Sequence, residues 1–344
     1  MPDAKPDARA ASRSKVSATV DIERSGRQVG HLAVPHSRDD SAWGAVRVPI
    51  AVFKNGKGPT VLLTAGNHGD EYEGQIALRK LIRSLDPSAI QGRVIVMPAL
   101  NGPAVEAGRR LSPIDGVNMN RAFPGIRDGS VTRMIAHYVH SELLPHVDAA
   151  LDMHSGGKTL HFSPLAAIHA LDDPGLMART RAAMLAFAAP IALVLRELDA
   201  EGMLDTAVED LGKVFVSTEL GGGGTTSTAT IAIAERGVQN LLKHLAILAG
   251  RPETRESLGL PPTRLMRTPD QGYVIADDAG LLEMLVDLDQ KVRAGQPVAQ
   301  VYRLDRPSEA PVAYPARVDG VLIGRAHQCL VKPGDFVGLV AQAE

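Results

Sequence analysis

The sequence has few of the features that mark extracellular, membrane or nucleic-acid-binding proteins. It contains one cysteine, Cys329, in 344 residues, so no disulfide can form within the chain, which favours a reducing cytoplasm. No apolar run approaches the roughly 18–20 residues that span a membrane. The 37 basic and 39 acidic residues give a net charge of −2 with no long basic run. We therefore expect neither nucleic acid nor a membrane as a partner.

The polar residues 1–20 lack the apolar core of a secretory signal, and we expect a flexible N-terminal tail there. Over residues 21–255, apolar segments alternate with amphipathic ones. Strand patterns lie at 59–66, 93–101, 148–156, 191–197 and 213–220, and helical patterns at 71–85, 131–147, 174–189 and 230–250. This alternation predicts an α/β domain with helices on both faces of its sheet.

Residues 262–344 contain no convincing helical pattern, and turn signals recur along them. The segments 279–302 and 319–341 resemble each other, because each runs from a Gly through apolar alternation to V-x-x-G. This pairing predicts a small all-β domain similar to the lipoyl/biotinyl sandwich barrels. Such carriers need an exposed lysine between the two halves, and residues 303–320 contain none. We therefore expect a structural or interface role for this domain, and a homo-oligomeric protein.

Two motifs at predicted strand ends contain metal-ligating residue types. GNHGDEYEG places His68 and Glu71 in an H-x-x-E pair where a strand ends and a helix begins, and LDMHSGG places His154 after another strand. Each motif alone is also compatible with a capping loop or a structural histidine. Together, two imidazoles and a carboxylate match the His2Glu set of catalytic zinc sites, which keep a fourth position open. Glu71 is expected in the first turn of the helix.

Two further motifs contain residues suited to binding a substrate and moving a proton. NMNRAFPG contains Asn120 and Arg121, and a guanidinium with an adjacent amide can bind a carboxylate. Arg109 or Arg110, just upstream, could stabilise a developing oxyanion. FVSTELGGGG ends an apolar strand at Glu219, where a carboxylate could exchange a proton with water and a leaving amine.

In this order, the motifs H-x-x-E, N-x-N-R-x-F-P-G, D-x-H-S-G-G and E-x-G-G-G-G resemble the succinylglutamate desuccinylase/aspartoacylase family. The resemblance implies a zinc-carboxypeptidase-like mixed sheet flanked by helices, followed by the small β domain. It also implies one Zn²⁺ per chain and hydrolysis of an N-acyl amino acid, a small-molecule substrate. By motif position it implies the following roles: His68, Glu71 and His154 as zinc ligands, Glu219 as acid/base, Arg110 as carbonyl-polarising residue, and Asn120 and Arg121 as carboxylate clamp. Arg109 stays an alternative to Arg110.

The segments SRDDSAWGAVRVPI and GKVFVSTELGGGG further resemble family members that deacetylate N-α-acetyl-L-2,4-diaminobutyrate in ectoine degradation. That substrate has a side-chain ammonium, which calls for an acidic partner. Glu197, Asp199, Asp205 and Glu209 are candidates, and Asp199 is favoured because it follows an apolar strand. The alternatives are deacylation of N-acetylaspartate or N-succinylglutamate, a metallocarboxypeptidase, and a non-catalytic metal-binding module.

Overall fold

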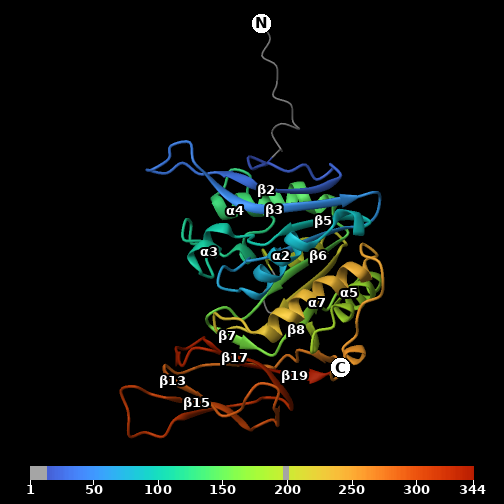
Figure 1. The fold of residues 1–344 in the computed structure, drawn as a ribbon. Coiled ribbons are helices and arrows are strands. Elements are labelled where there is room, and N and C mark those ends of the chain that lie inside the picture. Colours follow the sequence, from blue (N-terminus) through green and yellow to red (C-terminus); the bar gives the residue numbers. More distant parts are fainter. Residues whose placement is uncertain (1–13, 197–200) are drawn as a thin grey trace.

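The computed structural model describes residues 14–196 and 201–344, and its centre is a large mixed sheet (Figure 1). In the described residues the strands follow the order β1-β2-β3-β5-β4-β6-β10-β8-β9-β11-β19-β17-β14. Those from the first part of the chain are β1 (Ser17–Ala18), β2 (Gly26–Pro35), β3 (Ala45–Asn55), β4 (Thr60–Ala65), β5 (Gly92–Met97), β6 (Ala149–His154), β7 (Leu160–Phe162), β8 (Leu165–His169), β9 (Ile191–Leu195) and β10 (Val214–Glu219). The mixed α/β fold agrees with the sequence prediction.

Helices cover both faces of this sheet. They are α2 (Glu73–Ser84), α3 (Gly102–Ala107), α4 (Val131–Tyr138), α5 (Pro174–Phe187), α6 (Leu204–Glu209) and α7 (Thr228–His244). Alternate residues of each central strand enter different cores: Leu63 packs with α2, α5 and α7, whereas Leu62 packs with α4 and α6. A strand buried on both faces must be apolar at nearly every position, and β4 is completely buried along its length.

Among the described residues, no helix is long and apolar enough to cross a membrane.

The chain after α7 is almost entirely β structure, as the sequence predicts. Its strands are β11 (Arg264–Arg267), β12 (Tyr273–Ile275), β13 (Gly280–Met284), β14 (Lys291–Val292), β15 (Pro297–Tyr302), β16 (Val312–Pro315), β17 (Gly320–Ala326), β18 (Leu330–Val331) and β19 (Phe336–Ala343). Four of them form a second sheet in the order β16-β15-β13-β18. This β-rich part lies at the end of the molecule opposite β2 (Figure 1).

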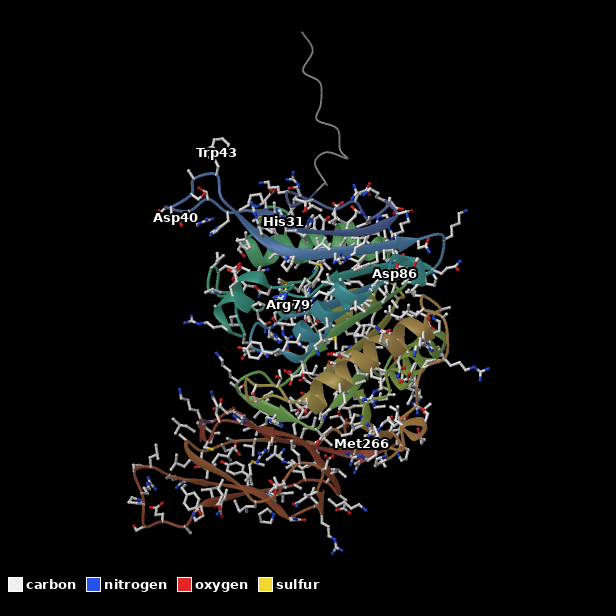
Figure 2. All side chains as sticks on the ribbon, in the orientation of Figure 1. His31, Asp40, Trp43, Arg79, Asp86 and Met266 are labelled. Atoms are coloured by element: carbon white, nitrogen blue, oxygen red, sulfur yellow. The ribbon has the colours of Figure 1, made fainter. Side chains whose placement is uncertain are left out.

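The β-rich part is continuous with the large sheet. β11 pairs in parallel with β9 and antiparallel with β19, and β17 pairs with β7. A separate apolar cluster fills this junction and includes Met266, Leu193 and Leu339. Figure 2 shows Met266 where the two parts meet. The domain division at about residue 260 stays a prediction, since hydrogen bonds cross it.

Candidate metal centre and substrate cavity

Three adjacent strands of the sheet run in parallel and end at one edge. β4, β6 and β10 pair in register, with β6 in the middle. His68 lies in the loop after β4, His154 is the last residue of β6, and Glu219 is the last residue of β10, directly opposite His154. Because the carboxyl ends of parallel strands meet at the same edge, three segments distant in sequence converge there.

His68, Glu71 and His154 form a buried cluster in which one ligand atom of each lies within 4.8 Å of the others. Glu71 lies two residues before α2, so it belongs to the loop and not to the first helical turn expected from the sequence. Its Oε1 is 2.7 Å from His68 Nδ1, and its Oε2 is 2.8 Å from His154 Nδ1. The Ser155 backbone N–H also donates to Oε2, at 3.2 Å.

The far nitrogens of both imidazoles contact oxygens of a surrounding layer. Asp152 Oδ2 accepts from His154 Nε2 at 2.9 Å, and Asn118 Oδ1 lies 3.0 Å from His68 Nε2. Fixing Nε2 in this way directs each Nδ1 at the same point, as in metal sites where a carboxylate or carbonyl orients the histidine. Two Nδ1 atoms and a carboxylate suit a divalent cation such as zinc.

Burial and the charges of neighbouring groups have opposing effects on the pKa values of His68, His154 and Glu71. Burial lowers the pKa of His68, and the Glu71 charge offsets this only partly. Burial also acts to lower the pKa of His154, but Asp152 and Glu71 outweigh it and raise that pKa well above the usual value. Although burial opposes it, the two imidazoles lower the pKa of the Glu71 carboxyl. Glu71 is therefore an anion at neutral pH, as a metal ligand must be.

Glu219 has the properties of a proton-transfer residue. Burial, assisted by the nearby Glu71 charge, raises the pKa of Glu219 to about 8. Its Oε2 is buried and has no hydrogen-bond partner among the described residues. Such a carboxyl can exchange a proton near neutral pH. The glycines that follow allow the close packing of this loop, since a Cβ on Gly222 would lie 2.0 Å from the Leu160 carbonyl oxygen.

Arg110 reaches the cluster, with Nη1 3.3 Å from His68 Nδ1 and 3.5 Å from Glu71 Oε1. The neighbouring Arg109 contributes a backbone carbonyl that accepts from Gly69 N–H at 2.8 Å. Arg110, and not Arg109, lines the cavity beside the cluster. This placement favours Arg110 over the alternative left open by the sequence.

Asn120 and Arg121 line the same cavity, from the short helical turn Met119–Arg121. Asn120 Oδ1 accepts from Leu204 N–H at 3.0 Å and lies 3.3 Å from Asn67 Nδ2. Both bonds use the amide oxygen, and within the described part of the chain no hydrogen bond uses the amide nitrogen of Asn120. Arg121 Nη1 donates to the Asn120 carbonyl at 2.6 Å.

One cavity of about 250 Å³ is lined by all the predicted metal-binding and catalytic residues and by the predicted carboxylate clamp. These residues are His68, Glu71, Arg110, Asn120, Arg121, His154 and Glu219. Asp199 and the weaker candidate Glu197 lie outside the described residues. Asp152, Asn118 and Asn67 were not predicted from the sequence. The D-x-H spacing was a usable signal for Asp152, because residues i and i+2 of a strand point to the same face.

Comparison with known proteins identifies close relatives. Residues 57–245 match the succinylglutamate desuccinylase/aspartoacylase catalytic domain. The chain is 49% identical to an N-alpha-acetyl-L-2,4-diaminobutyric acid deacetylase from Halomonas elongata, over 96% of this chain and 95% of that protein.

Solved structures give the same result. The product-bound ectoine utilization protein EutE (DoeB) from Ruegeria pomeroyi is 48% identical and superimposes with a TM-score of 0.92, covering 96% of this chain and 99% of that one. A succinylglutamate desuccinylase/aspartoacylase from Rhodobacter sphaeroides is 41% identical, also with a TM-score of 0.92 and the same coverage.

Proposed function

The chain belongs to the succinylglutamate desuccinylase/aspartoacylase family, and from this premise we propose that it hydrolyses N-α-acetyl-L-2,4-diaminobutyrate to 2,4-diaminobutyrate and acetate. It is an enzyme that hydrolyses linear amides of N-acyl amino acids. The observation that carries the substrate proposal is the 49% identity, over 96% of the chain, to a relative named for this deacetylation.

We propose one Zn²⁺ per chain, held by His68, Glu71 and His154. The support is the convergence of both Nδ1 atoms on the Glu71 carboxylate, together with the orienting contacts behind each ring. A zinc ion bound there would supply a Lewis acid that polarises a carbonyl and lowers the pKa of water toward about 7.

The protein's own residues then have distinct tasks. Glu219 accepts the proton of the attacking water and delivers it to the leaving α-amine. Arg110 donates to the acyl oxygen as negative charge develops there. Asn120 and Arg121 bind the α-carboxylate and so fix which amide meets Glu219.

We further propose that residues 262–344 form a lipoyl/biotinyl-like sandwich barrel with a structural role. Support comes from the second sheet and from its own apolar core, which includes Val298, Val301 and Val337. The pairing of β17 with β7 places this part beside Leu160, which lines the cavity. A homo-oligomeric assembly and a cytoplasmic location complete the proposal, the latter resting on the single cysteine.

A substrate panel tests this function. Initial rates are measured on N-α-acetyl-2,4-diaminobutyrate, N-acetylaspartate, N-succinylglutamate and a short peptide with a free C-terminus. The same assays follow chelation and zinc readdition. The proposal predicts the highest kcat/KM on N-α-acetyl-2,4-diaminobutyrate, loss of activity on chelation and its return with zinc. A higher kcat/KM on N-acetylaspartate, N-succinylglutamate or the peptide would assign a different substrate to the enzyme, and activity that resists chelation would exclude the metal.

A further inference from the structure

Leu160 lines the cavity together with His154 and Glu219, and it is the first residue of β7. We propose that the Leu160 side chain is the wall of the acyl subsite and restricts the enzyme to very short acyl groups such as acetyl. The inference rests on the proposed function, because it takes the α-carboxylate of the substrate to bind at Asn120 and Arg121. It does not depend on which amino acid is attached to the acyl group.

The order of elements along the edge of the sheet places the acyl group beside Leu160. Asn120 contacts Asn67, which lies in the loop after β4. His154 and Glu219 end the next two strands, β6 and β10. Beyond them, the Leu160 carbonyl accepts from an N–H of the loop that follows Glu219. An amide whose α-carboxylate is bound at Asn120, and whose carbonyl lies at the candidate metal centre, therefore has its acyl group on the Leu160 side.

Apolar residues of β8, β9 and β10 line a part of the cavity that is farther from this edge. β8 runs antiparallel to β10, so Leu165 lies opposite Glu219, and Ala167 lies opposite Ser217, one step further from the edge. Ala167 lines the cavity, and so does Leu195 at the end of β9, which runs parallel to β8. This part of the cavity continues along the face of the sheet and suits the amino-acid part of the substrate.

The backbone of Leu160 is held in place from several sides. Its N–H donates to the Gly156 carbonyl and its own carbonyl accepts from the Gly223 N–H, both at 2.9 Å. β7 lies beside β17 (Figure 1), where Leu160 pairs with Ala326 of the β-rich part. A Cβ on Gly156 or on Gly222 would overlap with the Leu160 carbonyl oxygen. A longer acyl chain would therefore meet a fixed wall, and such overpacking is unfavourable.

The length of the acyl chain is the variable that tests the inference. We measure kcat/KM for the N-acetyl, N-propionyl and N-butyryl derivatives of the amino acid that the substrate panel selects. The wild type should prefer acetyl over butyryl at least about tenfold, since one methylene in an apolar pocket changes kcat/KM about 10–200-fold. Leu160→Ala should reduce this preference to within about threefold. Leu160→Val removes a single carbon and disturbs packing less, and it should raise the kcat/KM for propionyl relative to acetyl.

Leu195→Ala is the matched control, because Leu195 is also a partly buried leucine that lines the cavity and packs against the same apolar cluster. It should keep the acyl preference of the wild type. Equal kcat/KM of the wild type on the three derivatives would overturn the inference. It would also be overturned if both Leu160 variants kept the wild-type preference, or if Leu195→Ala relaxed it equally. If the preference changes as expected, but on an amino acid other than 2,4-diaminobutyrate, the proposed substrate fails and the acyl wall stands.

Discussion

Replacing Asp152 by asparagine tests whether the surrounding layer of hydrogen bonds controls the metal centre. In the folded protein the Asp152 carboxylate accepts from three donors: Thr64 Oγ1 at 2.7 Å, Asn67 Nδ2 at 2.8 Å and His154 Nε2 at 2.9 Å. An asparagine fits the same space in one orientation. In the opposite orientation the amide N–H₂ would face the N–H groups of Asn67 and His154, which are donors themselves. The amide N–H₂ must therefore face the Thr64 hydroxyl, which can accept a hydrogen bond.

In that orientation Asp152→Asn keeps its contact with His154 and loses only the negative charge. The charge raises the pKa of His154 and increases its basicity as a ligand. Loss of such a partner typically weakens metal binding about 10–100-fold, or roughly 1.4–2.7 kcal/mol. We expect a zinc dissociation constant higher by this factor, measured by competition with a chelating dye at pH 7.

Asp148→Asn is the control, since Asp148 lies just before the opposite end of β6 and accepts from Thr60 N–H at 2.8 Å. It should leave zinc affinity unchanged. An Asp152→Asn protein that is folded and binds zinc as tightly as the wild type would refute the role given to this layer.

Three further predictions concern other parts of the molecule. Arg110→Ala should lower kcat/KM about 10²–10³-fold in the deacetylation assay, whereas Arg109→Ala should stay within a few-fold of the wild type. Gly237→Ala should lower the midpoint of urea unfolding, because the new Cβ would lie 2.2 Å from the Phe187 ring and overpacking outweighs the gain in helix propensity; an unchanged midpoint would contradict this packing. Hydrogen bonds from Lys54 and Arg93 lower the pKa of Glu23 from 4.5 to about 2, so their stabilisation is present above pH 4.5 and is lost as the pH falls toward 2. Between pH 4.5 and pH 2 the free energy of unfolding should fall more steeply with pH in the wild type than in Glu23→Gln. Parallel plots of this free energy against pH would show that the hydrogen bonds of Glu23 do not contribute to stability.

The sequence predicted those features of the site that depend on local patterns. An apolar run ending in Gly or His marks the end of a strand, and parallel strands in an α/β fold end at one edge. These two rules are enough to place His68, His154 and Glu219 at a common edge, where the folded chain has them. The long apolar strands and the helix α7 follow from the same periodicity.

Other features depend on pairing between distant segments. The antiparallel insertion of β8 between β10 and β9, and the junction of β7 with β17, have no local sequence signal. The role of Asn118 follows from the direction in which the His68 imidazole points, which is set only in the packed structure. The site for the side-chain ammonium illustrates the same limit: a strand-end rule favoured Asp199, which lies outside the described residues, whereas another of the sequence candidates, Asp205, lines the cavity.

The most direct test of the account is the turnover of a zinc-loaded Glu219→Gln variant on N-α-acetyl-2,4-diaminobutyrate. Glutamine preserves the shape of the side chain but cannot accept the proton. The account predicts one zinc per chain by elemental analysis, as in the wild type, and a kcat reduced about 10²–10⁴-fold. A variant that retains zinc and turns over at the wild-type rate would contradict the proton-transfer role of Glu219 and the mechanism built on it.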